Sequence, residues 1–205
     1  MREMKDSGID WIGKIPIKWN TKAIRYFIKE HLSGSWGNDE QGNENDRVCV
    51  RIADFDYPKI KFKENIQYTI RNYSDSDIAN KTLDCSMMFG VTSPDYRVFR
   101  LRNKENNDLT YFKYIMQCCY MSRIFYSLGQ GVSNLGRWRL QTTAFNNFMI
   151  PVPPFDEQKE IAQYLDKKIS EIDTIIAEKK QQIRTIEEYK KSLIFEYVTG
   201  KKEVL

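Results

Sequence analysis

The sequence predicts an α+β protein, in which a mixed domain over residues 1–150 is followed by a proline hinge and one long helix within residues 151–205. Three observations support this prediction. Short runs of alternating apolar and polar residues recur in the first part, as in half-buried strands. Prolines cluster at 151–154. After them, apolar residues recur at steps of three and four, which is the spacing of one helix face.

The long helix is expected to begin after Pro151-Val152-Pro153-Pro154, because proline fixes φ and keeps the preceding residue extended. Asp156 is placed to cap it, and Val198-Thr199-Gly200 supplies a stop signal. About 43 residues at about 1.5 Å each would form a rod about 65 Å long. A rod of that length cannot bury its apolar seam on a domain of about 150 residues, so the seam favours pairing with another helix. The seam comprises Leu165, Ile169, Ile172, Ile176, Ile183, Ile186, Leu193 and Tyr197, with Lys179 and Lys190 in two further seam positions.

The domain begins with three segments that are rich in turn signals. Residues 6–19 contain glycines, a proline and two tryptophans, which predict an irregular arm packed by its aromatic rings. Residues 21–32 fit either a helix or a short strand. Residues 33–45 predict a polar loop whose glycines favour mobility.

The rest of the domain alternates between strand and helix patterns. Alternating runs predict strands within residues 48–53, 60–62, 68–70 and 91–101. Aromatic and aliphatic residues at helical spacing predict a buried helix over 109–128. A glycine-rich basic loop follows at 129–139, and the chain then returns to the hinge.

The composition is that of a cytoplasmic protein without a metal site. The 205 residues are 41% hydrophobic and 29% charged, and no apolar run is long enough to span a bilayer or serve as a signal region. The four cysteines form no Cys-x-x-Cys pair and there is a single histidine, His31. We therefore expect reduced thiols and neither a disulfide framework nor a bound metal.

The net charge of +4 is distributed unevenly. Residues 156–205 carry 10 basic and 11 acidic residues, so the remaining 155 residues carry the positive excess. Within them, residues 97–140 contain eight basic residues and two acidic ones. This excess fits either a surface that faces a polyanion or a solvated basic face, and charge alone does not separate the two.

The sequence carries no recognisable catalytic motif. A metal-dependent nuclease needs an aspartate on one strand and Glu-x-Lys on the next, converging on magnesium. Asp156, Glu157 and Lys159 supply those residue types, but helix capping in a single first turn explains them. No phosphate loop, cofactor-binding glycine loop or methyltransferase motif occurs, so we expect a chain that is not an enzyme and has no cofactor.

Two segments resemble parts of the specificity subunits of type I restriction–modification systems. The first is the opening, Asp6-Ser7-Gly8-x-x-Trp11-x-Gly13-x-Ile15-Pro16-x-x-Trp19. The second resembles the join between target recognition domain and conserved helix, and reads Ile150-Pro151-Val152-Pro153-Pro154-Phe155-Asp156-Glu157-Gln158-x-x-Ile161-Ala162. The tail, with Tyr189-Lys190-x-Ser192-Leu193-Ile194 and Val198-Thr199-Gly200, is also similar to that family's helix.

The resemblance implies a fold and a set of partners. The fold is a β-rich target recognition domain with flanking helices, followed by a long helix that forms a coiled coil. A full-length specificity subunit has two such domains and two such helices, whereas this sequence has one of each. The resemblance therefore implies a half-length, non-catalytic subunit that pairs with a copy of itself. The partners it implies are double-stranded DNA and the modification and restriction subunits, without a membrane.

DNA-binding residues are expected mainly in the glycine-rich loop and among the arginines of the domain. Arg, Asn and Gln read base edges, and Arg and Ser hold phosphates. A basic surface turn is the alternative for this loop. Loop 34–45 also offers amides, but it includes three acids. The candidates are Gln130, Ser133, Asn134, Arg137, Arg139, Arg97, Arg100, Arg102, Arg47 and Arg51.

The resulting hypothesis is a specificity subunit that dimerises through its long helix to read a bipartite and palindromic DNA site. An alternative hypothesis is a truncated or silent specificity fragment that acts only as an interaction or assembly protein. A standalone nuclease would require magnesium-dependent cleavage by the isolated chain, which we do not expect.

Overall fold

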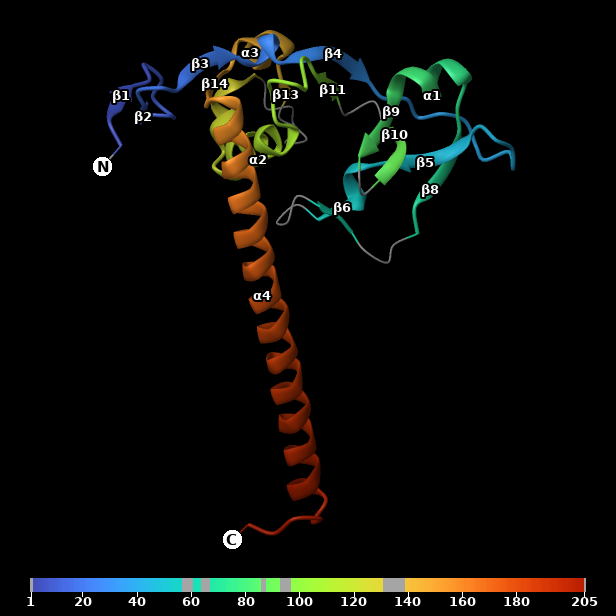
Figure 1. The fold of residues 1–205 in the computed structure, drawn as a ribbon. Helices are drawn as coiled ribbons and strands as arrows, with labels where there is room; N and C mark the ends of the chain where they lie inside the picture. Colours follow the sequence, from blue (N-terminus) through green and yellow to red (C-terminus); the bar gives the residue numbers. More distant parts are fainter. Residues whose placement is uncertain are drawn as a thin grey trace. The chain divides into compact units, whose positions relative to one another are not determined.

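The computed structural model describes residues 2–56, 61–63, 67–85, 88–92, 97–130 and 139–204. It divides into two compact units, Met1–Gln158 and Lys159–Leu205 (Figure 1). The first unit mixes small β-sheets with short helices, and the second continues one long helix. The predicted α+β class is confirmed.

The largest sheet has four strands in the order β8-β5-β10-β9. β10 runs parallel to β5, whereas β8 and β9 pair antiparallel with their neighbours. The side chains of Cys49, Tyr73 and Val91 form its buried core, and Ile78 packs against them. Ile78 belongs to helix α1, which the sequence did not predict. The bounds in this part are β5 (Asp46–Val50), β8 (Thr69–Asn72), α1 (Asp75–Lys81), β9 (Thr82–Cys85) and β10 (Met88–Thr92).

Among the described residues, the first unit contains five further antiparallel strand pairs. The predicted irregular arm contains one of them, since Met4–Asp6 pairs with Lys14–Pro16. The segment left open between helix and strand contains β3, the 3₁₀ turn η1 (Ile24–Tyr26) and β4. The pairs are β1 (Met4–Asp6) with β2 (Lys14–Pro16), β3 (Asn20–Ala23) with β14 (Met149–Val152), β4 (Ile28–Ser33) with β11 (Arg97–Leu101), β6 (Phe55–Asp56) with β7 (Lys61–Phe62), and β12 (Gly129–Gln130) with β13 (Arg139–Leu140).

Aromatic rings pack around helix α2 (Leu109–Met121) and strand β14. Phe112 of α2 contacts Phe27 with ring centroids 4.9 Å apart. Trp11 of the arm stacks on Phe148 at 5.3 Å, which agrees with the predicted packing of the arm by its aromatic residues.

The predicted helix over residues 109–128 is too long. Helix α2 ends at Met121, and Arg123 then adopts a left-handed φ of 56°. The chain continues as the 3₁₀ turn η3 (Ile124–Leu128). Because a left-handed residue cannot continue a right-handed helix, the apolar spacing beyond Met121 belongs to this separate turn. A further short helix, α3 (Thr142–Asn147), precedes β14.

The proline segment is bonded into the first unit. The hydroxyl of Tyr111 donates to the carbonyl of Pro151 at 3.1 Å. Gln158 is 1% exposed; its side chain accepts from the backbone N–H of Asp108 at 3.0 Å and donates to the carbonyl of Pro153 at 3.0 Å. Helix α4 (Phe155–Val198) begins one residue before Asp156, so Asp156 lies in its first turn and the predicted N-cap is wrong.

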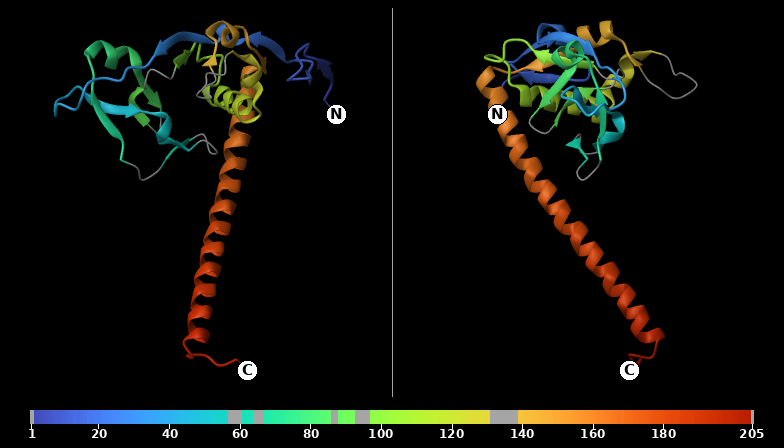
Figure 2. Two further views of the ribbon diagram at one scale, coloured as in Figure 1. Left: turned by 180° about the vertical axis from the view of Figure 1, so that it is seen from behind. Right: turned by 90° about the vertical axis from the view of Figure 1, so that its right-hand side faces the viewer.

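Helix α4 is unbroken over 44 residues, as two further views also show (Figure 2). At about 1.5 Å per residue it is about 66 Å long. It ends before Gly200, whose φ is +69°. In the part of the chain that the structure describes, neither α4 nor any other helix is long and apolar enough to cross a membrane.

Candidate nucleic-acid interface

The predicted contact loop 129–139 begins and ends in a strand pair. Gln130 of β12 lies opposite Arg139 of β13, and Gly129 lies opposite Leu140. The pairing therefore brings two candidate DNA-binding residues together at the base of the loop. Ser133, Asn134 and Arg137 lie outside the described residues.

The candidate arginines around β11 differ in what they contact. Arg97 is opposite Ser33 in the β11–β4 pair, and Arg100 is exposed. Arg102 follows β11 directly. Its Nε donates to the carbonyl of Ile28, and its backbone N–H donates to the carbonyl of Phe27 at 2.6 Å. Arg102 therefore helps to join β11 to the start of β4.

Two arginines of the four-stranded sheet hold the polar loop 34–45. Arg47 and Arg71 lie opposite each other in the β5–β8 pair. The Nη1 group of Arg47 donates to the carbonyls of Glu44 and Asp46. Arg71 forms an ion pair with Asp39 at 2.6 Å, and its Nε donates to the carbonyl of Trp36 at 3.1 Å. These guanidinium groups therefore bind to the loop itself.

The carboxylate of Asp46 organises the end of this loop. It accepts the backbone N–H groups of Gln41, Gly42 and Asn43, the shortest at 2.6 Å from Gly42. It also accepts the side-chain amide of Asn72 at 2.9 Å. The bond from Asn72, followed by those from the backbone, lowers the pKa of Asp46 below its ordinary value. The predicted mobile loop is thus anchored on β5 and β8.

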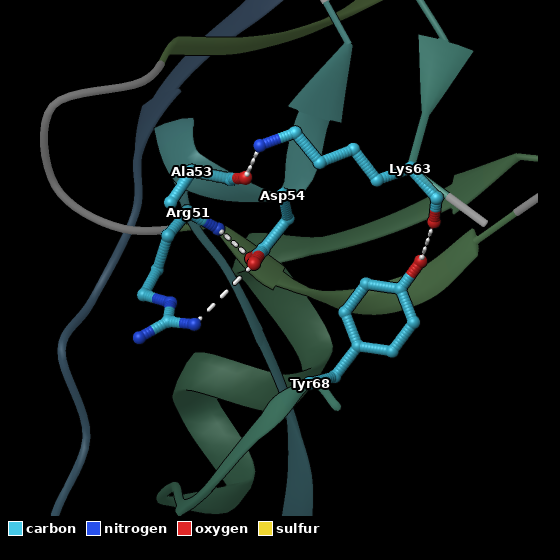
Figure 3. Close-up of polar contacts among 5 residues, drawn as sticks. All are labelled: Arg51, Ala53, Asp54, Lys63 and Tyr68. Carbon is cyan, nitrogen blue, oxygen red and sulfur yellow. Dashed lines mark hydrogen bonds and ion pairs between the residues drawn. The ribbon is translucent and has the colours of Figure 1, made fainter. Parts of the chain in front are cut away.

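Arg51 is held by a buried carboxylate that the sequence analysis missed (Figure 3). Asp54 is 1% exposed and accepts the backbone N–H of Arg51 at 2.7 Å. Its other oxygen pairs with Nη2 of Arg51 at 3.3 Å. In Figure 3 the remaining terminal nitrogen of Arg51 points away from Asp54. The arginine is therefore oriented before any ligand binds. The sequence signal for this ion pair is an Arg-x-x-Asp spacing directly after the predicted strand.

The turn that carries Asp54 is closed by two further side chains (Figure 3). The ammonium group of Lys63 donates to the carbonyl of Ala53 at 2.8 Å, and the backbone N–H of Lys63 donates to the carbonyl of Asp54 at 2.8 Å. The Tyr68 hydroxyl donates to the carbonyl of Lys63 at 3.1 Å. These bonds join η2 (Ile52–Asp54) to the residues that follow β7.

The three cysteines whose side chains the structure describes show no feature of a reactive site. Cys49 and Cys119 are buried and Cys118 is exposed, and all three are free. Burial, with a smaller contribution from Cys118, raises the pKa of Cys119 to about 12. That thiol stays protonated at neutral pH and is a poor nucleophile. Within the described ranges, no three His, Cys, Asp or Glu side chains gather in a way that could hold a metal ion.

All eight predicted seam residues lie in α4. Ile172, Ile176, Ile183 and Ile186 are 53%, 45%, 56% and 65% exposed, and Tyr197 is 40% exposed. Leu165, Ile169 and Leu193 are half-buried. Apolar side chains exposed to this degree along one helix face are typical of a surface that another chain covers.

Comparison with known proteins gives a family and a fold. A family model described as the type I restriction modification DNA specificity domain matches residues 52–185, which is more than half of the chain. No curated protein matches. The crystal structure of the HsdS subunit from Thermoanaerobacter tengcongensis is similar, with a TM-score of 0.52 and 14% sequence identity. The similarity covers 83% of this chain but 41% of that one, so this chain spans less than half of its length.

Proposed function

Because the chain belongs to the type I restriction modification DNA specificity domain family, we propose that it is the non-catalytic specificity subunit of a type I restriction–modification enzyme. The family match carries this proposal, since it extends from the turn after β5 to well inside α4. In this role the first unit reads DNA, and the helix joins it to the rest of the enzyme.

A two-part DNA site requires a second reading unit, and self-association would supply it. The chain contributes one α+β unit and one long helix. The exposed isoleucines of α4 support pairing with the same helix in a second copy. Two copies related by a two-fold axis would read a bipartite, palindromic site with a fixed spacer. The outer faces of the paired helices would then receive the modification and restriction subunits.

Selection from a random duplex pool tests this function. The full chain is mixed with the modification subunit, bound duplexes are recovered, and the enriched sequences are read. Enrichment of one motif with two inverted halves at constant spacing is the expected result. Recovery of all sequences in equal proportion would show that the chain confers no specificity.

A second candidate function is that of a specificity fragment that acts only in assembly. This candidate is tested because the match covers only 41% of the HsdS chain. Replacing residues 131–138 by a short glycine linker between β12 and β13 separates the two. Assembly with the modification subunit should survive in both cases. Loss of motif enrichment supports the specificity subunit, whereas an unchanged and unselective pool supports the assembly protein.

A further inference from the structure

A cavity of about 500 Å³ lies in the first unit, and none of the residues described in its lining belongs to the segment 129–139. Three segments form it: β3 with the residues beside it, the loop between β11 and α2, and the chain from the end of β14 into the first turn of α4. Its polar side chains include Lys18, Asn20, Lys22, Asn103 and Asn106.

The chemistry of the lining favours an anion. Lys18 and Lys22 are both exposed, and neither ammonium group has a partner among the described residues. No carboxylate is among the described residues that line the cavity.

Four acids adjoin lining residues in the sequence. Glu105 and Asp156 are exposed, and Asp108 caps α2 by accepting the N–H of Tyr111 at 2.8 Å. Glu157 lines a neighbouring cavity with Lys18, forms an ion pair with Arg2 and accepts the indole N–H of Trp19 at 2.8 Å. The described lining of this cavity therefore contributes two ammonium groups and no carboxylate, and Glu157 beside it is bonded to Arg2 and Trp19.

The amide groups add donors that suit phosphate and sugar oxygens. Asn20 alternates with Lys22 on β3, so both side chains lie on the same face of that strand. Asn103 and Asn106 come from the loop between β11 and α2, and Asn103 takes a left-handed φ of 53°, which asparagine tolerates. Amide and ammonium groups are the usual protein contacts to the DNA backbone.

The walls of the cavity are fixed in advance. Gln158 is bonded to Asp108 and Pro153, as described above. The side-chain amide of Asn107 donates to the carbonyls of Arg102 and Asn103, each at 3.1 Å. Little ordering of the protein is therefore needed when a ligand enters. The conformational entropy cost of binding is smaller at such a preformed site.

Much of the remaining lining is apolar, and one of its aromatic residues is in contact with a cation. Val152, Pro153 and Pro154 contribute flat apolar surface. Tyr26 is 60% exposed, and the guanidinium of Arg25 lies 5.0 Å from the centre of its ring. A deoxyribose ring has an apolar face that such a surface accepts, while its phosphates require cations.

We propose that this cavity binds one nucleotide unit of the DNA sugar–phosphate backbone, with Lys18 and Lys22 holding its phosphates. The proposal rests on the proposed function, because it assumes that the first unit binds duplex DNA. The contact is independent of base sequence and fixes the position of the unit on the duplex. The two lysines, together with the asparagine amides beside them, favour this ligand over an acidic segment of a protein partner. Such a segment would place its carboxylates at the same two lysines.

The test compares two double variants of the full chain. Lys18→Gln with Lys22→Gln removes both cavity charges. Lys5→Gln with Lys14→Gln removes two exposed charges from β1 and β2, outside the cavity lining. Binding to a labelled random duplex is measured by fluorescence anisotropy with the modification subunit present, at several salt concentrations. Each lost phosphate contact lowers the slope of log affinity against log salt by about 0.9.

We expect the cavity variant to lose between about one and two units of slope and to bind all sequences more weakly, with the control variant close to wild type. Lysine acetylation followed by mass spectrometry gives a second readout, in which duplex should protect Lys18 and Lys22 but not Lys5. Equal slopes for wild type and cavity variant, or no protection, would overturn the proposal. Unchanged DNA binding with lost capture of the modification subunit would overturn it in favour of an acidic protein segment. Failure of the wild type to bind any duplex would instead contradict the proposed function.

Discussion

Asp54 ends the turn that follows β5, and its carboxylate is almost fully buried beside Arg51. A buried carboxylate is costly unless it is bonded, and here it has both a backbone N–H and a guanidinium group. The exposed pair of Arg71 with Asp39 differs, because the side chain of Asp39 is 96% exposed and water competes for it. Loss of the carboxylate should therefore lower the free energy of unfolding much more at Asp54 than at Asp39.

Asp54→Asn should lower the free energy of unfolding by about 1–3 kcal/mol, because charge-assisted hydrogen bonds are lost in a buried place. Asp39→Asn, the control, should cause little or no change. Urea unfolding of both variants followed by tryptophan fluorescence measures the difference. Similar stabilities for the two variants would show that burial does not strengthen the Arg51–Asp54 pair.

Loop 34–45 is bonded to β5 and β8 by Asp46, Arg47 and Arg71. Its backbone also approaches β8 closely at Gly37, whose φ is +61°. A Cβ atom at Gly37 would lie 2.6 Å from the carbonyl oxygen of Asn72 and 2.8 Å from the ring of Tyr73. Gly42 has a similar φ of +72°, but nothing lies within 4 Å of a Cβ there. The two glycines differ in packing while sharing the same backbone conformation.

Alanine at these two positions should have unequal effects. Gly42→Ala should lower the free energy of unfolding by about 1–2 kcal/mol, which is the cost of a left-handed backbone conformation for a residue with a Cβ atom. Gly37→Ala should cost about 1–3 kcal/mol more, because the loop must move away from β8. Thermal unfolding gives the ranking, and hydrogen exchange at residues 38–46 shows whether the loop is released. Equal destabilisation would mean that the close approach at Gly37 is not required.

At the scale of the whole molecule, a row of isoleucines is exposed over much of α4. The second unit, Lys159–Leu205, contains no other segment that could cover this row among its described residues. Lys179 and Lys190 interrupt the row, and polar residues in a seam limit the registers in which two helices can pair. The proposed dimer follows from this arrangement, and its apolar positions should supply most of its stability.

Ile183→Glu should convert the dimer to a monomer, because it places a charge in the centre of the seam. Sedimentation velocity at tens of micromolar distinguishes twice the chain mass of 24.4 kDa from a single copy. Gln181→Glu is the matched control, since residue 181 lies on the opposite face of the helix and is exposed. A monomeric wild type, or a dimer that tolerates Ile183→Glu, would remove the self-pairing part of the proposed function.

Local patterns made α4 and the strands β5, β7, β8 and β11 predictable, because the apolar spacing of each element can be seen in consecutive residues. The parallel pairing of β5 with β10 is different, since Cys49 and Val91 come together across 42 positions and neither strand specifies its partner. Helix α1 was missed although it carries a signal: the Ser74 hydroxyl accepts the N–H of Asp77 at 3.2 Å. Its seven residues are too few to show a helical period.

The candidate interface was only partly predictable for a related reason. Arginines were chosen by residue type, and type does not show which of them are bonded inside the fold, as Arg47 and Arg102 are. The cavity lysines were overlooked because the other polar residues of the lining come from residues 103–106, far along the chain. The alternation of Lys18, Asn20 and Lys22 was the one local signal.

The bonds of Tyr111, Asp108 and Trp19 to the segment 151–158 have a consequence for building chimeras. Trp19 donates to Glu157 at 2.8 Å, and Asp108 and Tyr111 bond to Gln158 and Pro151. If the first unit were transplanted onto a foreign helix with its junction at residue 150, the acceptors of all three bonds would be exchanged. A junction after Gln158 would carry them along intact. Modular exchange of specificity should therefore treat residues 1–158 as the cassette, with the first turn of the helix included.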